Sequence, residues 1–552
     1  MKKASKFILA GVLTLIVAAV LFYIFLPAIN VYSQEFWVFL TFTVIVFGVI
    51  SFLLSLKENK NNAFGKKFEL KKISGFKVII AVAAVPVVVL IVGNIISSTF
   101  FNAQKYANII DVKEAVFETD MPESEIVNNI ALMDSATADT IGDRKLGELS
   151  AVVSQYQVSG IYNQINYHKT PKKVSTLEYG DFFKWFNNRD SGIPGYIMVD
   201  PVNPNAEYEE FKEPVHYSES AYFGEDLHRA LRFLYPTKIF GSYAFEIDDN
   251  GNPYYIVSCM TPKVGLFGAL DVSEVVIFNP VDGTGELYEL SDVPPWVDNV
   301  FTGALASQKY DWHGTLKNGY WNSVIGNKEC KVTTDDFGYI VIDDDVWFFT
   351  GVTSVSNDES NIGFIISNAR TGEYKFYNVI GAEEYSAMRA AEGEVQEKGY
   401  IASFPSLINV AGEATYIMVL KDNGGLVKLY ALVNVEQYDV VATGTTQMEA
   451  KQEYLRLLEQ KGIIKDDGTV EKNENIADIT VSDIRIVTLG GESVMYITGD
   501  NGILYKQNIS ADESLMLISE GDKIKISYYD TEISEIKQIF KWSASVETGS
   551  GE

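Results

Sequence analysis

Three long runs of apolar residues lie near the beginning of the chain. They extend over Phe7–Ile29, Phe36–Leu56 and Val78–Ser98, and none contains Asp, Glu, Lys or Arg. Each is about as long as the ~20 residues that a helix needs to cross the hydrocarbon core of a bilayer. A helix satisfies its own backbone hydrogen bonds, which makes it the expected form of such a run in lipid. We therefore predict a membrane anchor in residues 1–100, with transmembrane helices at about 7–29, 36–56 and 78–98.

Beyond residue 100 the pattern becomes mixed. Apolar residues recur every three or four positions in several segments, a spacing typical of amphipathic helices. These segments are residues 106–116, 126–133, 144–157 and 221–235. Residues 160–210 are irregular and aromatic by pattern, apart from a strand expected at 192–199. We expect residues 101–240 to form a helical and aromatic-rich outer region.

A strand pattern then recurs three times within residues 241–460. Strands rich in β-branched and aromatic residues are followed by turns in which Asp-Asn-Gly or Asp-Gly supplies the positive φ angles of tight hairpins. The copies are residues 245–286, 339–373 and 414–430, and helices are expected at Ala382–Lys398 and Gln447–Gln460. We predict tandem repeats, each combining a helix with an antiparallel sheet.

The end of the chain has a different spacing of predicted strands and turns. After a charged linker at about residues 466–475, short strands alternate with Gly-containing turns over residues 476–542. This spacing predicts a small β barrel or sheet of five or six strands. The predicted fold class is therefore a membrane-anchored α+β protein with three transmembrane helices, tandem α+β repeats and a C-terminal β domain.

The lysines around the apolar runs predict an orientation. Lys2, Lys3 and Lys6 precede the first run, seven further lysines lie between the second and third, and residues 30–35 contain no Lys or Arg. Positively charged loops stay in the cytoplasm, so we predict a cytoplasmic N-terminus and an extracytoplasmic region after about residue 100. A cleaved signal peptide is the alternative for the first run, but its apolar core is long for one and lacks a clear cleavage site.

Charge is divided unevenly along the chain. Residues 1–100 hold ten Lys, no Arg and three Glu, a net charge of +7, whereas the whole chain carries −28, so residues 101–552 carry −35. Such a region repels nucleic acid and an anionic membrane surface, and it tolerates cell-wall polymers, cations and basic partners. Solubility is the simpler explanation of the charge. We expect the lipid bilayer and an envelope protein as partners, and no nucleic acid.

Residue types that commonly carry chemistry are few and scattered. The four histidines, His168, His216, His228 and His313, form no HExxH or other paired metal spacing, and the chain has no GxSxG motif. Ser74–Lys77 matches SxxK only by its letters. Two cysteines, Cys259 and Cys330, either pair across a long loop or remain buried free thiols. We predict no catalytic, cofactor-binding or metal-binding residue and no cofactor.

Two acidic turns and a group of tryptophans leave alternatives open. Asp248–Asn252 places oxygen atoms at alternate positions, as a calcium loop does, but a hairpin turn is the better interpretation because no Glu closes the loop. Asp343–Asp345 could likewise bind a cation, and a solvated turn is again the better interpretation. Trp185, Trp296, Trp312, Trp321 and Trp347 either bind sugars and peptides or fill cores, and core filling is favoured.

Part of the repeat region resembles a known family. Residues 245–255 followed by 282–286, and the second copy ending in Arg370–Glu373, resemble the PepSY-type, cystatin-like module, which implies an inhibitory or chaperone-like role. Residues 130–454 also resemble an uncharacterised family of Gram-positive multi-pass membrane proteins. That resemblance rests on Gly351–Ser354, Asp358–Phe364 and Leu420–Asp422 and implies no activity.

These patterns favour a non-enzymatic protein of the cell envelope whose outer region binds or scaffolds other envelope proteins. A cell-wall-acting enzyme with an unrecognised site and an extracytoplasmic sensor are the alternatives. A concave pocket with two carboxylates roughly 5–10 Å apart would favour the enzyme. A long groove lined by Trp and Tyr, without such a pair, would favour binding.

Overall fold

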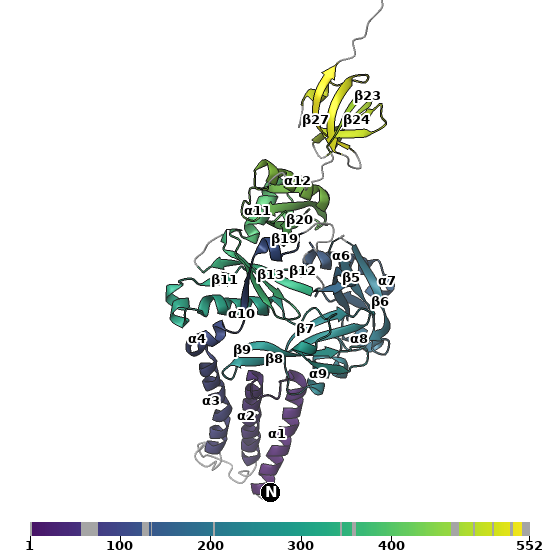
Figure 1. Ribbon diagram of the computed structural model, residues 1–552. Helices are drawn as coiled ribbons and strands as arrows, with labels where there is room; N and C mark the ends of the chain where they lie inside the picture. Colours follow the sequence, from purple (N-terminus) through teal and green to yellow (C-terminus); the bar gives the residue numbers. More distant parts are fainter. Residues whose placement is uncertain are drawn as a thin grey trace, which may run out of the picture. The chain divides into compact units, whose positions relative to one another are not determined.

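The computed structural model (Figure 1) describes residues 3–56, 76–123, 132–133, 135–202, 205–342, 345–355, 360–464, 474–489, 492–509, 513–529 and 534–543. The chain forms two compact units, residues 1–458 and 459–552. The first contains three long apolar helices and four sheets of four to six strands, and the second contains a closed barrel. The mixed α+β class is therefore confirmed.

The three apolar runs are helices, as predicted. They are α1 (Lys3–Phe25), α2 (Gln34–Leu56) and α3 (Phe76–Ser97), with mean hydropathies of 2.8, 2.5 and 2.6 over their apolar stretches. By length and composition each is able to cross a membrane. α1 ends earlier than predicted because Leu26 has a positive φ of 48° and Pro27 follows it, and neither position continues a helix. α2 packs against both of its neighbours.

The segment after α3 is less helical than its pattern predicts. It contains α4 (Thr99–Ala107), β1 (Val112–Ala115), α5 (Phe117–Asp120), α6 (Ser135–Gly147) and α7 (Ser150–Val153). The helix expected over 106–116 is wrong beyond Ala107, because β1 pairs in parallel with β16 (Tyr374–Tyr377). The helix expected over 144–157 gives way at its end to β2 (Tyr156–Val158), which pairs with β4. Of the segment 126–133, only residues 132–133 are described.

The first sheet occupies the region that the pattern marks as irregular, so that expectation is wrong. Its order is β2-β4-β5-β6, with β3 also paired to β4. The strands are β3 (Asn163–Tyr167), β4 (Thr170–Tyr179), β5 (Ile193–Asp200) and β6 (Asn205–Val215), and β5 confirms the strand predicted at 192–199. Between β4 and β5, Asp181 caps the short helix α8 (Phe182–Asn188) by accepting the backbone N–H groups of Phe183 and Lys184.

The second sheet is a four-stranded antiparallel meander in the order β10-β9-β8-β7. It follows η4 (Phe223–Glu225) and α9 (Leu227–Leu234), so the helix expected over 221–235 is shorter than predicted. The strands are β7 (Ile239–Ile247), β8 (Pro253–Val264), β9 (Gly268–Phe278) and β10 (Gly285–Glu289), followed by η5 (Leu290–Asp292). The hairpin predicted at 245–257 is confirmed, with Ile247 paired to Pro253.

The third and fourth sheets also follow helices. After α10 (Gly303–Leu316) and η6 (Asn322–Gly326), the third has the order β1-β16-β15-β13-β11, with β12 on β13. Its strands are β11 (Lys331–Thr333), β12 (Gly338–Ile342), β13 (Asp345–Ser354), β15 (Gly363–Asn368) and β16; β14 (Ser360–Asn361) pairs with β17 (Gly381–Ala382).

The fourth sheet follows α11 (Glu384–Glu394) and η7 (Gln396–Lys398), where a helix was predicted. Its order is β18-β20-β21-β22, with β19 on β20. The strands are β18 (Ile401–Ala402), β19 (Ser406–Val410), β20 (Glu413–Lys421), β21 (Val427–Asn434) and β22 (Val441–Gly444). The helix α12 (Gln447–Gln460) follows, as predicted.

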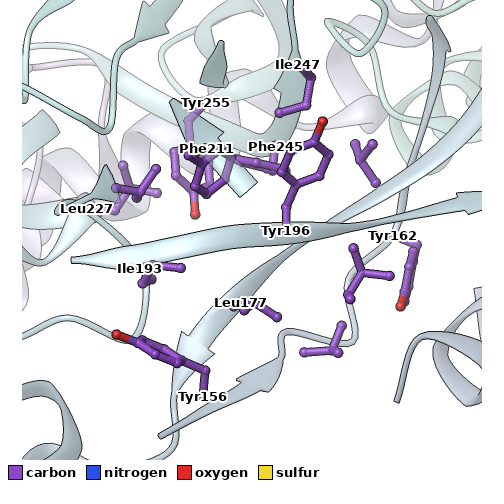
Figure 2. Close-up of a cluster of buried hydrophobic side chains, with 14 of the residues drawn as sticks. Tyr156, Tyr162, Leu177, Ile193, Tyr196, Phe211, Leu227, Phe245, Ile247 and Tyr255 are labelled. Atoms are coloured by element: carbon purple, nitrogen blue, oxygen red, sulfur yellow. The ribbon is translucent and has the colours of Figure 1, made fainter. Parts of the chain in front are cut away.

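The hydrophobic cores join the sheets in pairs. One core combines residues of the first and second sheets, and Figure 2 shows Tyr196 and Phe211 of the first beside Phe245 of the second. The Tyr196 and Phe211 rings are stacked with centroids 5.1 Å apart, and Phe245 lies 6.1 Å from Tyr196. A second core combines the third and fourth sheets with α11. Burial of these large rings is the main force that holds the sheets together.

A similar turn closes the last hairpin of all four sheets. Asp200, Asn279 and Asn368 each use a side-chain oxygen to accept the backbone N–H two residues later, at 2.9 Å. Asn434 accepts the N–H three residues later, at 2.8 Å. Such Asx turns hold the backbone without help from other elements.

The residue after each of these turn residues uses its carbonyl oxygen to accept backbone hydrogen bonds. The donors lie in the segment that precedes the helix of the same sheet. Pro201 accepts from the N–H groups of Leu132 and Met133, Pro280 from His216 and Tyr217, Ala369 from Val300 and Phe301, and Val435 from Ala382, at 2.7 to 3.3 Å. These donors precede α6, α9, α10 and α11 in turn. The end of each sheet is thereby tied to the start of its own helix.

The second unit is a closed five-stranded barrel, as the strand pattern predicted. It comprises β23 (Glu474–Leu489), β24 (Glu492–Gly499), β25 (Leu504–Asn508), β26 (Lys523–Tyr529) and β27 (Ser534–Ser543) in the order β23-β24-β25-β27-β26. β25 and β27 pair in parallel, and η9 (Glu513–Leu517) lies between β25 and β26 in the chain. This is the strand order of a Greek-key barrel of the OB type. The expected linker at 466–475 lies mostly outside the described residues.

Candidate functional site

A cavity of about 340 Å³ lies where the apolar helices meet the second sheet. It is lined by Phe25, Leu26, Ala28, Glu35, His228, Arg232, Ile239, Phe240 and Tyr243. Phe25 ends α1, Leu26 and Ala28 lie in the connection to α2, and Glu35 lies in the first turn of α2; α9 and β7 supply the rest. Its volume is at the lower end of those that hold small molecules in proteins.

Arg232 is the most unusual residue of this cavity, because it is a cation that is only 5% exposed. Nε donates to the carbonyl oxygen of Leu26 at 2.9 Å, and Nη1 donates to that of Lys238 at 2.6 Å. The ring of Phe240 lies 4.6 Å away. Burial lowers the pKa of Arg232. Among the described residues no ion pair includes Arg232, so its charge is held by carbonyl oxygens and an aromatic face rather than by a carboxylate.

The cavity has polar groups of both signs set among aromatic walls. Glu35 in the first turn of α2 faces the same space as Arg232, and its charge favours the cationic form of that arginine. The ring of His228 lies edge-on to Tyr243 at 4.5 Å. A small molecule with an anionic group for Arg232 and a cationic or hydrogen-bonding group for Glu35 fits this arrangement.

The walls of the cavity are tied together by hydrogen bonds across the junction. The N–H of Ile29 donates to the carbonyl of Pro236 at 2.7 Å, and the side chain of Asn30 donates to that of Thr237 at 2.9 Å. At the other end of the junction, the hydroxyl of Ser97 accepts the N–H groups of Leu266 and Phe267. The apolar helices and the second sheet are therefore firmly joined on both sides.

The four histidines do not come together. His168 lies in the exposed turn between β3 and β4, and Nδ1 of His216 lies 3.1 Å from the carbonyl oxygen of Arg189. Nδ1 of His313 lies 2.8 Å from the carbonyl oxygen of Ala107, and burial lowers the pKa of that imidazole. Within the described ranges, no three His, Cys, Asp or Glu side chains are grouped so that they could hold a metal ion.

Asp248 confirms the hairpin-turn interpretation of its acidic segment. Its carboxylate accepts the backbone N–H groups of Asn250 and Asn252, at 2.9 and 2.8 Å, and the side-chain amide of Asn252. Asp343 and Asp344 lie outside the described residues. Asp345 is paired with Arg370, whose Nε and Nη2 each donate at 2.8 Å. The Asp248 carboxylate is thus used within its own turn, and the Asp345 carboxylate binds the turn that follows β15.

The tryptophans divide between core and surface. Trp185 and Trp347 are buried, as core filling predicts, and Trp296 and Trp312 pack partly buried against Tyr254 and Tyr106. Trp321 is 63% exposed, so core filling is wrong for it. Cys259 and Cys330 are both buried free thiols. Of the SxxK letters, Ser74 lies outside the described residues.

Two buried carboxyl groups were not singled out by sequence. Glu246 on β7 is fully buried and accepts the N–H groups of Asp298 and Asn299, at 3.0 and 2.7 Å, and burial raises its pKa to about 7. Burial, followed by the charge of Glu246, raises the pKa of Asp298. The Asp298 carboxylate accepts the N–H of Asn166 at 2.7 Å, which links the first and second sheets.

These two carboxyl groups brace the junction of the sheets, and being 0% and 2% exposed they cannot reach a polymeric substrate. Their pairing joins residues 52 positions apart, which no local motif in the sequence signals.

Comparison with known proteins supplies no relative, since no protein-family model and no curated protein matches the chain.

Proposed function

We propose that the chain is a multi-pass protein of the cell membrane, with its N-terminus in the cytoplasm and the residues after about 100 outside. Three observations support this. α1, α2 and α3 are long and apolar enough to cross a bilayer. The ends of α1 and α3 both contact the same sheet, so the folded region emerges on one side. In the sequence, the ten lysines of residues 1–100 fall at positions 2–6 or 57–77 and none falls between α1 and α2, which agrees with a cytoplasmic location of the positively charged segments.

We further propose that residues 132–444 comprise four tandem repeats, one more than the sequence pattern indicates. The Asx turn and the carbonyl bond to the segment ahead of the helix recur in all four sheets. A repeated bond between non-local segments is difficult to explain by chance, because each copy joins residues more than 50 positions apart. The order of helix, antiparallel sheet and closing turn also supports a PepSY-like module.

The function that this architecture supports best is non-enzymatic binding or scaffolding of other envelope proteins. The observation that carries it is that the repeats are joined to one another through shared cores and to the apolar helices by hydrogen bonds. A rigid array of modules held at the membrane offers an extended, preformed surface to protein partners. The buried carboxyl pair does not favour a cell-wall-acting enzyme.

The proposal is tested by affinity purification from membranes of the native host. The full chain, a version that ends at residue 464 and a version that lacks residues 101–552 serve as baits. We expect envelope proteins that copurify with the first bait and not with the last, and the middle bait assigns them to one of the two units. Equal recovery of proteins by the full chain and by the version lacking residues 101–552 would contradict the scaffold function.

A second candidate function, an extracytoplasmic sensor, is favoured by the cavity at Arg232. Its walls come from both the apolar helices and the second sheet, so a molecule bound there contacts both. Free amino acids and dipeptides are suitable probes because they carry an anionic and a cationic group. We expect one of them to raise the unfolding temperature of the purified chain, and Arg232→Gln to abolish that shift. Arg389→Gln, on the exposed side of α11, is the matched control.

A further inference from the structure

Two clusters of exposed apolar side chains lie beside the ends of the apolar helices. The α4 cluster comprises Phe100, Phe101, Trp321, Val324 and Ile325, which are 46% to 74% exposed. The α8 cluster comprises Phe183, Phe186, Phe223 and Phe233, which are 52% to 73% exposed. Single exposed apolar residues are ordinary on protein surfaces, whereas contiguous groups of them mark interaction sites.

The α4 cluster continues directly from α3. α4 begins at Thr99, two positions after α3 ends at Ser97. The ring of Phe100 lies edge-on to the ring of Trp321, with centroids 5.8 Å apart. The side chain of Gln104 donates to the carbonyl of Lys317 at 2.8 Å. These contacts hold Trp321 and the following η6 beside the end of α3.

The α8 cluster adjoins the end of α1. The ring of Phe233 lies 5.9 Å from that of Phe22. The guanidinium of Arg229 lies 4.3 Å from the ring of Tyr23 and donates to the carbonyl of Phe223. The ring of Phe182 joins the rest of the cluster, with centroids 5.6 Å from Phe183, 6.2 Å from Phe186 and 6.4 Å from Phe223. Elements of different sheets thus bring aromatic side chains to the same end of the helices.

The segments that carry these clusters are basic, in contrast to the region around them. Residues 99–107, 181–190, 223–238 and 317–329 together hold eight Lys and Arg and five Asp and Glu, a net charge of +3. Residues 101–552 as a whole hold 35 Lys and Arg and 70 Asp and Glu. A basic residue close to an anionic bilayer strengthens binding to it. Aromatic residues favour the level of the lipid headgroups, so the two features point to the same partner.

We propose that the α4 and α8 clusters form an interfacial belt that seats the outer region on an anionic phospholipid surface. The aromatic rings enter the boundary between headgroups and acyl chains, and the neighbouring lysines and arginines bind lipid phosphates. This inference rests on the proposed membrane anchoring of α1, α2 and α3. It also revises the expectation that net charge keeps the whole outer region away from an anionic membrane, because basic residues outnumber acidic ones in the segments that carry the two clusters.

The test places a fluorescent thiol label at one position at a time in the full chain, reconstituted in vesicles of phosphatidylcholine and phosphatidylglycerol. Cys259 and Cys330 are buried and do not compete for the label. Ile325→Cys and Phe183→Cys report on the two clusters. Tyr438→Cys, 55% exposed and between β21 and β22, is the control, and Val12→Cys reports on α1. A lipid with a nitroxide near its glycerol group quenches labels that lie at the interface.

We expect quenching at positions 325 and 183 to be at least about twofold stronger than at 438, and to weaken when phosphatidylglycerol is omitted. Replacing Lys184, Arg189, Lys317 and Lys328 by Gln should remove that lipid dependence, whereas Lys398→Gln should not. Quenching at position 12 by an acyl-chain nitroxide without quenching at 325 and 183 would overturn the belt and leave the anchor intact. Loss of quenching at all three positions would overturn both.

Discussion

Lys309 on α10 donates a 2.7 Å hydrogen bond to Asp271 on β9, and this ion pair joins the helix of the third sheet to the second sheet. The two side chains are only 4% and 13% exposed. The ammonium group also lies 5.1 Å from the ring of Phe301, whose N–H takes part in the repeated carbonyl bond of the third sheet. A buried pair of this kind fixes how successive modules are placed.

Removing one partner of this pair should destabilise the first unit. Lys309→Met leaves the Asp271 carboxylate buried without its cation, which typically costs about 3–5 kcal/mol. The double variant Lys309→Met, Asp271→Leu should recover most of that loss, because no buried charge remains. Chemical denaturation of the purified chain measures both. Equal losses in the single and double variants would contradict this account, because the loss would then not come from the unpaired carboxylate.

Gly93 in α3 provides a second test, of the contact between the apolar helices and the second sheet. A Cβ atom at this position would lie 2.2 Å from the ring of Phe267, in the turn between β8 and β9. Gly93→Val should displace that turn and increase its cleavage by proteases in detergent. Gly11→Val is the matched control, because nothing lies within 4 Å of its Cβ position. Unchanged cleavage in Gly93→Val would contradict the packing of Phe267.

Stability should fall as pH rises from about 4.5 to about 7. Burial raises the pKa of Glu246, and separately that of Glu384, from 4.5 to about 7. The folded chain therefore holds protons that the unfolded chain releases in this range, so stabilisation present below the unfolded pKa is lost on approaching the folded one. The change is on the order of 3 kcal/mol for each group.

Thermal unfolding at about pH 5 and about pH 7.5 measures this dependence. Glu246→Gln should reduce the difference between the two conditions, and Glu246→Gln with Glu384→Gln should reduce it further. If the difference in unfolding temperature between the two pH values is the same in the wild type and the double variant, other groups cause it. Glu178→Gln, at a carboxyl group in the first sheet whose pKa burial also raises, tests whether the effect belongs to these two positions.

If the four sheets are repeats, then the turn residues Asn279 and Asn368 should contribute to stability in the same way. Asn279→Ala and Asn368→Ala each remove side-chain hydrogen bonds to backbone N–H groups in matching positions. Each should cost about 1 kcal/mol of unfolding free energy or more. Asn368→Ala should cost somewhat more, because the Asn368 amide also donates to Asp345 at 2.8 Å. Asn250→Ala, at an exposed position of another hairpin, is the control. A large loss in one copy and none in the other would argue against the repeat proposal.

The sequence predicted well what depends on local pattern. Local signals predicted the three apolar helices, the Asp248 hairpin, α12 and the C-terminal barrel. In each case the periodicity or the turn residues that form the signal lie within the element itself. α8 was missed although Asp181 is a good helix cap, because aromatic residues such as Phe182 and Trp185 are typical of strands.

What the sequence could not predict depends on distant contacts. β1 is a strand because it pairs with Tyr374 and its neighbours, more than 250 positions away. The first sheet, which we propose to be a further repeat, was missed because its strands lack the Asp-Gly turn of the predicted copies. The cavity at Arg232 brings together α1, α2, α9 and β7, and no spacing along the chain indicates that meeting.

The most direct test of the account is the side of the membrane on which each end of the apolar helices lies. Ser5→Cys and Tyr438→Cys place single exposed thiols in the first turn of α1 and in the turn between β21 and β22. We predict that a membrane-impermeant maleimide labels position 438 in intact cells and position 5 only after the cells are permeabilised. Labelling of position 5 in intact cells, with position 438 protected until permeabilisation, would contradict the proposed placement of the outer region.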